Sequence, residues 1–390
     1  MNKKLLISNI NTKQEGGFNI LSADVDGDLI FFKVPDKFPL YINAEWFIGI
    51  SLLEAMVSQR DIEVDAGVAV SRVFYDQLSE LQTIYSKWNP KLKKIALNCE
   101  LSNRDKQFTH TGSFFSAGVD SSYTLMAKRD EITHLIMLRG FDMGDDDSAW
   151  NRRIENQTAF AESCGKELIP VDTNARDWTE EKEIGWSFAH GLLISSAGEN
   201  LGMNRLYVAS SHTYDNLFPW GSHPLTDPMW STESTKVIHH GSGYSRTQKT
   251  KTILESPDVA ENLQVCWKNI DKNCGQCSKC IRTMAAVFLL NSEVKSLPKL
   301  QMSQLNKLQP TTESLKSTVI DLLLLADETG NIEFYKKLKK YYLKYERSKI
   351  GPLIDKCFLN GILKRAYRRV MKPKWLNLRV VPINTENYDL

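Results

Sequence analysis

The sequence predicts a protein of the α/β class, built around a parallel sheet with crossover helices. Between residues 108 and 287, short apolar runs alternate with helical patterns, and this alternation is typical of such a sheet. Strands are expected at residues 113–115, 135–138, 168–171 and 206–209. Because ligands of parallel sheets bind beyond the carboxyl ends of the strands, a functional site is expected in the loops that follow them.

The composition is that of a globular protein. The 390 residues correspond to two or three domains of about 150 residues. Hydrophobic residues make up 42% and charged residues 25%, which excludes a disordered or fibrous chain. A net charge of +2 does not favour general binding to nucleic acid or membrane. Apolar runs fall short of the roughly 20 residues that cross a bilayer, and the start lacks the core of a secretion signal, so a cytoplasmic protein is expected.

Residues 1–107 predict an N-terminal α+β domain. Apolar runs flank Asp26-Gly27, which favours a β-hairpin because glycine adopts positive φ without penalty. Residues 44–56 carry apolar side chains at a spacing of three, as on one buried face of a helix. Ser71 is expected to cap a second helix that ends near residue 89. The segment is therefore expected to pack against the sheet or to cover the substrate.

Residues 288–390 predict a helical C-terminal region with a basic tail. Helices are expected around residues 320–325 and 334–345. Residues 361–379 contain seven Lys or Arg side chains and no acidic one, with aromatic residues among them. Such a tail is either a solvated surface helix or a segment that binds RNA, where aromatic rings stack on bases and cations meet phosphates.

Four of the seven cysteines, Cys266, Cys274, Cys277 and Cys280, fall within fifteen residues. In a reducing compartment such a cluster favours thiolate metal ligands over disulfides. Four sulfur ligands suit tetrahedral Zn²⁺ and leave no open position for a substrate, so a structural zinc site is predicted. An iron–sulfur cluster and four unliganded core cysteines are the alternatives.

The segment 113–122, Ser-Phe-Phe-Ser-Ala-Gly-Val-Asp-Ser-Ser, combines a strand, a turn of small residues and the start of a helix. This order directs backbone N–H groups and the positive end of a helix at one point, where a phosphate is stabilised. The expected binding residues are Ser116, Ala117, Gly118, Val119, Asp120, Ser121 and Ser122, with Asp120 holding Mg²⁺ or orienting the loop. The alternative is a capped helix after a buried strand.

Residues 116–121 resemble the Ser-Gly-Gly-X-Asp-Ser loop of the PP-loop ATP pyrophosphatase superfamily. The resemblance implies that the loop binds the pyrophosphate of ATP and that the protein forms an adenylated intermediate. The segment differs from a Walker loop because it has no Gly-Lys-Ser/Thr. Ala117 replaces the first glycine of the pattern, and alanine fits this position if its φ is negative.

The loop at residues 116–122 is followed about 150 residues later by the four clustered cysteines, which have the spacing Cys-X7-Cys-X2-Cys-X2-Cys and are called the knuckle below. This combination of motifs is similar to that of the 7-cyano-7-deazaguanine synthases. The resemblance covers residues 108–287. It implies a Rossmann-like domain with a zinc knuckle that activates a small-molecule carboxylate with ATP, followed by attack of ammonia or an amine. The implied cofactors are ATP, Mg²⁺ and Zn²⁺.

Residues 245–251, Ser-Arg-Thr-Gln-Lys-Thr-Lys, resemble a basic segment of PP-loop enzymes that reaches the nucleotide phosphates. Arg246 and Lys249 are therefore expected to act in catalysis with Asp120. The two cations would stabilise the charge that develops as pyrophosphate leaves. A solvated helix start is the alternative.

A polar and aromatic loop after the strand at 206–209 is expected to contact the substrate. Its candidate residues are His212, Asp215 and Asp227. For each of them, a hydrogen bond that only stabilises the loop is the alternative.

Further carboxylates follow two other predicted strands. Asp142 follows the strand at 135–138 and is expected to contact ribose or adenine, while Asp172 is expected to face the same cleft. The run at 145–147 of three aspartates predicts a solvated loop rather than a metal site.

Two other functions also fit the sequence. An RNA-modifying PP-loop enzyme would use the basic tail to hold tRNA, and its sulfur-transfer variant would need a reactive cysteine, for which Cys164 is the candidate. A non-catalytic protein would bind ATP without turnover. The leading hypothesis is the adenylating enzyme, which requires no protein nucleophile.

Overall fold

The computed structural model describes residues 4–103, 106–139, 146–269 and 271–348. They form an α/β fold with a large, mostly parallel central sheet, consistent with a Rossmann-like fold. The strand order is β12-β11-β8-β9-β10-β3-β2-β1-β4-β6. In chain order these strands are β1 (Leu5–Glu15), β2 (Phe18–Val25), β3 (Asp28–Pro35), β4 (Ile62–Val64), β6 (Leu97–Asn98), β8 (His110–Phe114), β9 (His134–Leu138), β10 (Glu167–Thr173), β11 (Met203–Ala209) and β12 (Lys236–His240).

Five strands, β8 to β12, form the parallel half of the sheet. Four of them overlap the strands that the sequence predicts, although β8 ends at Phe114, and β12 is an additional edge strand. The chain leaves β8 toward β9 and β10 and then returns to the other side of β8 to form β11 and β12. The strand order therefore reverses between β8 and β11, and a crevice at the carboxyl ends of these two strands is the usual ligand site of an open α/β sheet.

The N-terminal strands extend the same sheet. β2 and β3 form the predicted hairpin, in which Asp26 and Gly27 have φ of 55° and 91°. β3 then pairs antiparallel with β10, where Thr173 lies opposite Phe32. A single apolar core runs from Leu5 to Val237, so sheet and core continue across the boundary predicted at residue 107.

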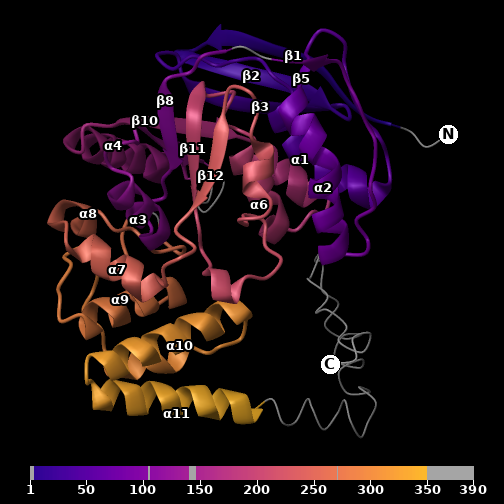
Figure 1. Cartoon of the computed structure of the whole chain (residues 1–390). Coiled ribbons are helices and arrows are strands. Elements are labelled where there is room, and N and C mark those ends of the chain that lie inside the picture. The colour runs from indigo at the N-terminus through magenta and orange to yellow at the C-terminus, as the bar shows by residue number, and fades with distance from the viewer. Residues whose placement is uncertain (1–3, 104–105, 140–145, 270, 349–390) are drawn as a thin grey trace, which may run out of the picture.

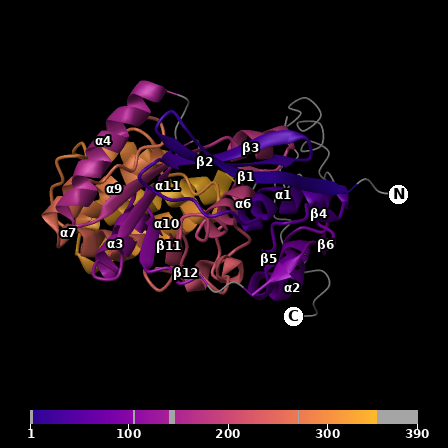
Figure 2. The ribbon, with the colours of Figure 1, turned by 90° about the horizontal axis from the view of Figure 1, so that it is seen from above.

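Helices cover both faces of the sheet (Figures 1 and 2). The α3 and α4 helices contact one face, whereas α1, α5 and α6 contact the other. The helices of these layers and the short strands beside them are α1 (Glu45–Ser58), α2 (Arg72–Trp88), α3 (Val119–Ala127), α4 (Asp147–Ser163), α5 (Ala175–Glu181), α6 (Trp186–Ser195), α7 (Arg246–Leu254), α8 (Pro257–Glu261), β5 (Val70–Ser71) and β7 (Leu101–Ser102), with 3₁₀ turns η1 (Tyr214–Asn216) and η2 (Asp227–Trp230). The predicted cap of α2 is confirmed, since the Phe74 N–H donates to Ser71 Oγ at 3.1 Å.

The C-terminal helices form a layer of their own beyond the carboxyl ends of the parallel strands (Figure 1). It consists of α9 (Ser278–Leu289), η3 (Met302–Lys307), α10 (Glu313–Glu328) and α11 (Ile332–Ser348). A separate apolar core joins α9, α10 and α11 through Ile281, Leu322 and Phe334. The helices predicted at 320–325 and 334–345 are confirmed, whereas the basic tail at 361–379 lies outside the described residues. None of the described helices has both the length and the apolar character needed to cross a bilayer.

Candidate functional site

A cavity of about 510 Å³ lies at the crevice where the strand order reverses. Its wall includes Phe114, Leu138 and Ala209, which are the last residues of β8, β9 and β11. The volume is in the range of small-molecule sites in proteins, about 300–1,000 Å³. Ser116, Gly118, Val119, Asp120 and Ser121 also line it, so the loop predicted to bind phosphate faces this cavity.

The loop is held closed by its own serine hydroxyls. The Ser116 N–H donates to Ser121 Oγ at 3.2 Å, and Ser121 Oγ donates to the Gly118 carbonyl at the same distance. The α3 helix begins at Val119, so its N–H groups lie at the loop as the sequence predicts. Ser122 is buried and, like Ala117, is not part of the cavity wall.

The backbone of Ala117 departs from the expectation of a negative φ. Its φ is +54°, in the left-handed region that glycine occupies without cost, and its side chain is fully buried. An alanine in this conformation costs roughly 1–2 kcal/mol. The loop therefore keeps a glycine-like turn although it lacks that glycine.

Asp120 lies among three cationic side chains. Its Oδ2 accepts from Arg246 at 2.5 Å and its Oδ1 from Lys249 Nζ at 3.2 Å, and Lys249 also donates to the Ser210 carbonyl at 2.6 Å. Burial by itself would raise the pKa of Asp120, but the charges of Arg246, Lys249 and Arg282 outweigh it and hold this pKa well below its usual value. Asp120 is therefore ionised, and it orients Arg246 at the cavity wall.

Three further cationic side chains, which were not predicted from the sequence to lie at the site, also line the cavity: Arg153, Lys279 and Arg282. Arg153 donates to the Ser116 carbonyl at 2.7 Å and so ties α4 to the phosphate loop. The Nε of Arg282 is buried and has no hydrogen-bond partner among the described residues. Burial, and next the neighbouring Arg246, lower the pKa of Arg282 to about 9. An anionic ligand would supply the missing acceptor.

The helical spacing of Lys279 and Arg282, directly after the last knuckle cysteines, is a signal from which both could have been predicted. Arg153 has no comparable local signal, because only the packing of α4 against the loop brings it to the cavity.

Aromatic side chains from α6 and from the loop after β11 also line the cavity. They are Trp186, His190, His212 and Trp220, with the His190 and Trp220 ring centroids 5.4 Å apart and those of His212 and Trp220 5.7 Å apart. Burial and then the nearby cations, against the opposing pull of Asp120, lower the pKa of His212 to about 4, so that its imidazole is neutral at pH 7. His212 thus lies at the cavity as expected.

The two other candidate substrate residues lie elsewhere. Asp215 is exposed on η1 and lines a second cavity beside the first. Asp227 is 1% exposed and accepts from Ser222 Oγ at 2.7 Å, and it is also 2.7 Å from His239 Nδ1. Its position supports the alternative, a carboxylate that stabilises the loop.

Where the structure describes them, the carboxylates predicted after the other strands do not line the cavity. Asp172 lies within β10 and forms an ion pair with Lys33 at 2.8 Å, so it stabilises the junction of β10 and β3 instead. The run at 145–147 was predicted to be a solvated loop, but Asp146 caps α4 and Asp147, which is exposed and paired with Arg139, is the first residue of that helix. Asp142 lies outside the described residues.

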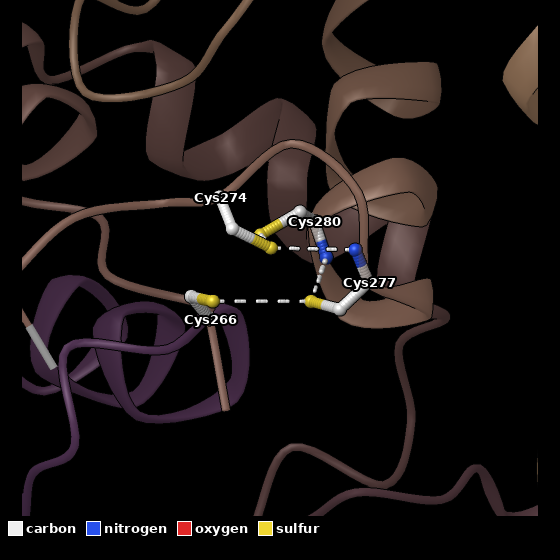
Figure 3. Close-up of side chains that lie close together, drawn as sticks. All are labelled: Cys266, Cys274, Cys277 and Cys280. Carbon is white, nitrogen blue, oxygen red and sulfur yellow. Dashed lines mark hydrogen bonds between the residues drawn. The ribbon is translucent and has the colours of Figure 1, made fainter. Parts of the chain in front are cut away.

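The four clustered cysteines converge on one point (Figure 3). Their sulfur atoms all lie within 4.8 Å of one another, and the Cys266–Cys277 and Cys274–Cys280 separations are 4.0 and 3.9 Å. Zn–S bonds of about 2.3 Å in a tetrahedron place the sulfurs about 3.8 Å apart. The arrangement therefore fits a zinc ion.

Backbone N–H groups also point at the sulfur atoms. Gln276 and Cys277 donate to Cys274 Sγ, and Cys280 donates to Cys277 Sγ, each at 3.4 Å. Burial opposes ionisation of Cys274, but these N–H groups lower its pKa to about 7. Burial raises the pKa of Cys280, so a bound cation is needed to stabilise its thiolate.

The knuckle forms part of the cavity wall. Cys266 and the adjacent Trp267 line the cavity directly. α9 begins at Ser278, directly after its cap Cys277, and carries Lys279 and Arg282 to the wall of the same cavity. A metal in the knuckle would thus fix the start of the helix that presents two of the cations.

Cys164 lies away from this site. It is 9% exposed at the end of α4 and packs in the apolar core on that face of the sheet. Burial raises the pKa of its thiol, which disfavours the reactive thiolate.

Positive charge predominates on the wall of the cavity. Among the described residues, Asp120 is its single carboxylate, whereas four side chains are cationic: Arg153, Arg246, Lys279 and Arg282. Such a wall attracts an anion, and the aromatic side suits a flat ring system. Comparison of the chain with protein-family models, curated proteins and solved structures found no match.

Proposed function

We propose that the protein is an ATP-dependent enzyme of the PP-loop pyrophosphatase type, which adenylates a carboxylate and releases pyrophosphate. Ammonia or an amine then attacks the acyl-adenylate, as in the 7-cyano-7-deazaguanine synthases that the sequence resembles. The observation that carries the proposal is one juxtaposition: a small-residue loop at a helix start faces a cavity whose wall holds four cations.

Different residues of the chain would bind the nucleotide and stabilise the leaving group. The N–H groups of the loop and the side chains of Arg246 and Arg282 would hold the β- and γ-phosphates, since Arg282 Nε has an open donor position. A carboxylate oxygen would attack the α-phosphorus, and the bond to the bridging oxygen would break with its electron pair left on pyrophosphate. The cations would stabilise that charge as it develops.

Mg²⁺ would enter with the nucleotide. Both carboxylate oxygens of Asp120 already accept from Arg246 and Lys249, which supports an orienting role for this residue over a role as the main metal ligand. The second step needs no protein nucleophile, because the nitrogen attacks the acyl carbon directly and AMP leaves.

Mass spectrometry of the products tests this function. The full chain is incubated with Mg-ATP, ammonium and 7-carboxy-7-deazaguanine, and then with a panel of other planar carboxylates. We expect AMP and pyrophosphate in equal amounts, formed only when a carboxylate is present, with the matching amide or nitrile. ADP with phosphate as the only products would contradict the proposal, and ATP binding without any turnover over the whole panel would favour a non-catalytic ATP-binding protein.

A further inference from the structure

A second cavity, of about 430 Å³, adjoins the first. The two share Ser211, His212 and Arg246 on their walls. The second cavity is bounded by η1, by the start of α7 and by α10, which packs against α7 and α9. α10 belongs to the C-terminal layer (Figure 1), so this layer completes the second cavity.

The charge of the second cavity is opposite to that of the first. Its wall carries two carboxylates, Asp215 and Asp321, and among the described residues Arg246 is its cation, already paired with Asp120. Asp215 makes no ion pair or hydrogen bond with its side chain within the described part of the chain. Asp321 accepts from the N–H and hydroxyl of Thr247, at 2.9 and 2.7 Å, and keeps further acceptor capacity.

The rest of the wall combines hydroxyl or amide groups with an apolar side. The polar members are Ser211, Thr213, Tyr214, Asn216, Ser242, Ser245, Gln248, Ser317 and Thr318. The apolar side comes from α10, where Ile320 is 40% and Leu324 65% exposed. A water-sized molecule such as ammonia fills about 30 Å³, less than a tenth of this space. The cavity therefore has room for a larger, organic molecule.

We infer that the second cavity is the acceptor site and that it takes a primary amine with an apolar group, not free ammonia. The ammonium group would be drawn to Asp215 and Asp321, and the apolar group would pack on Ile320 and Leu324. This inference rests on the proposed function, because it names the second substrate of the same reaction.

The shared wall places His212 where the two substrates would meet. The amine gives one proton to solvent before attack, and its lone pair then forms a C–N bond to the acyl carbon. The C–O bond to the phosphate breaks and its electron pair leaves with AMP. The nitrogen gives up its second proton as the new bond forms, and the neutral imidazole of His212 is placed to accept it.

Ligand-observed NMR titration of the full chain with 3-methylbutylamine tests the inference without turnover. The same samples are titrated with 3-methylbutanol and ammonium chloride as comparison ligands and with Mg-pyrophosphate as a probe of the first cavity. We expect the amine to bind at least about tenfold more tightly than either comparison ligand. Asp215→Asn and Leu324→Ser should each weaken the amine about fivefold or more, whereas Asp76→Asn, at an exposed position on α2, should not.

Two results would overturn the inference and leave the proposed function intact. One is binding of pyrophosphate without any binding of the amine. The other is amine binding that Asp215→Asn and Leu324→Ser leave unchanged while both variants unfold at the wild-type temperature. If the wild-type protein does not bind pyrophosphate at all, this result would instead contradict the proposed function itself.

Discussion

At the residue scale, the left-handed backbone of Ala117 and the open donor of Arg282 are the two features that distinguish the loop at residues 116–122 from an ordinary helix start. Ala117 adopts its positive φ because the turn between β8 and α3 needs it, and the buried methyl group packs in the core on that face. Arg282 has a buried Nε with no partner in the described structure. The first feature predicts a stability effect and the second a binding effect.

Ala117→Val should destabilise the fold by at least about 2 kcal/mol, because a β-branched side chain tolerates a left-handed backbone poorly and overfills the core. Ala117→Gly is the matched control. It relieves strain but loses buried surface and gains freedom in the unfolded chain, so it should stay within about 1 kcal/mol of wild type. Urea unfolding measures both, and a valine variant as stable as the glycine variant would argue against the left-handed turn.

Arg282→Gln should weaken pyrophosphate binding about tenfold or more, because it removes a charge-assisted hydrogen bond from a buried donor at the cavity wall. Arg152→Gln on α4 is the control, since Arg152 is exposed and pairs with Asp271 outside the cavity wall. Calorimetric titration measures both affinities. Equal loss in the two variants would mean that general positive charge, and not Arg282, holds the anion.

At the scale of elements, the sequence predicted those structural features that depend only on residues close to one another in the chain. The hairpin at Asp26-Gly27, the cap at Ser71 and the four strands of the parallel sheet follow from φ preferences and from periodicity, and all are present. The pairing of β3 with β10 joins residues about 140 positions apart and leaves no mark in either strand. The cysteine cluster was predictable because its members are close in the sequence. The contact of Arg153 with the loop was not, because it joins segments that are distant in the sequence.

Cys277→Ser should lower both metal content and pyrophosphate affinity, because Cys277 is one of the four clustered cysteines expected to hold zinc and also caps α9, which carries Lys279 and Arg282. We expect about one zinc per wild-type chain and a loss of affinity of about tenfold in the variant. Cys99→Ser, at a half-buried cysteine outside the knuckle, should change neither. Elemental analysis measures the metal content and calorimetry measures the affinity. If the protein contains iron and absorbs visible light, the site is an iron–sulfur cluster and not a zinc site.

At the scale of the whole molecule, the single sheet joins the N-terminal strands to the parallel half, and the C-terminal layer completes the site from the other side. Three histidines of the described residues lie at buried or half-buried positions in this assembly. Burial, as the largest cause, lowers the pKa of His212, His223 and His240 to about 4 each. Since the folded protein does not take up these protons near neutrality, the stability of the whole molecule depends on pH.

The free energy of unfolding should therefore fall as the pH drops from 7 to 5. Below about pH 6.5 the unfolded chain protonates these histidines while the folded protein does not, so the lowered pKa values contribute stability above this pH that is lost toward pH 4. The loss is on the order of 1–2 kcal/mol per histidine at pH 5. Urea unfolding at pH 5 and 7.5 measures it, and His240→Gln should reduce the difference. Stability that is equal at the two pH values would contradict buried neutral histidines.

In the proposed function, the loop at residues 116–122 and the surrounding cations hold the phosphates of ATP. Calorimetric titration of the full chain with Mg²⁺ and α,β-methylene-ATP tests it most directly, because the analogue cannot be cleaved at the α-phosphate and no carboxylate is needed. We predict one site per chain with a dissociation constant below about 1 mM, weakened about tenfold or more by Arg246→Gln. Absence of binding at millimolar analogue, or equal binding by the variant, would contradict the claim.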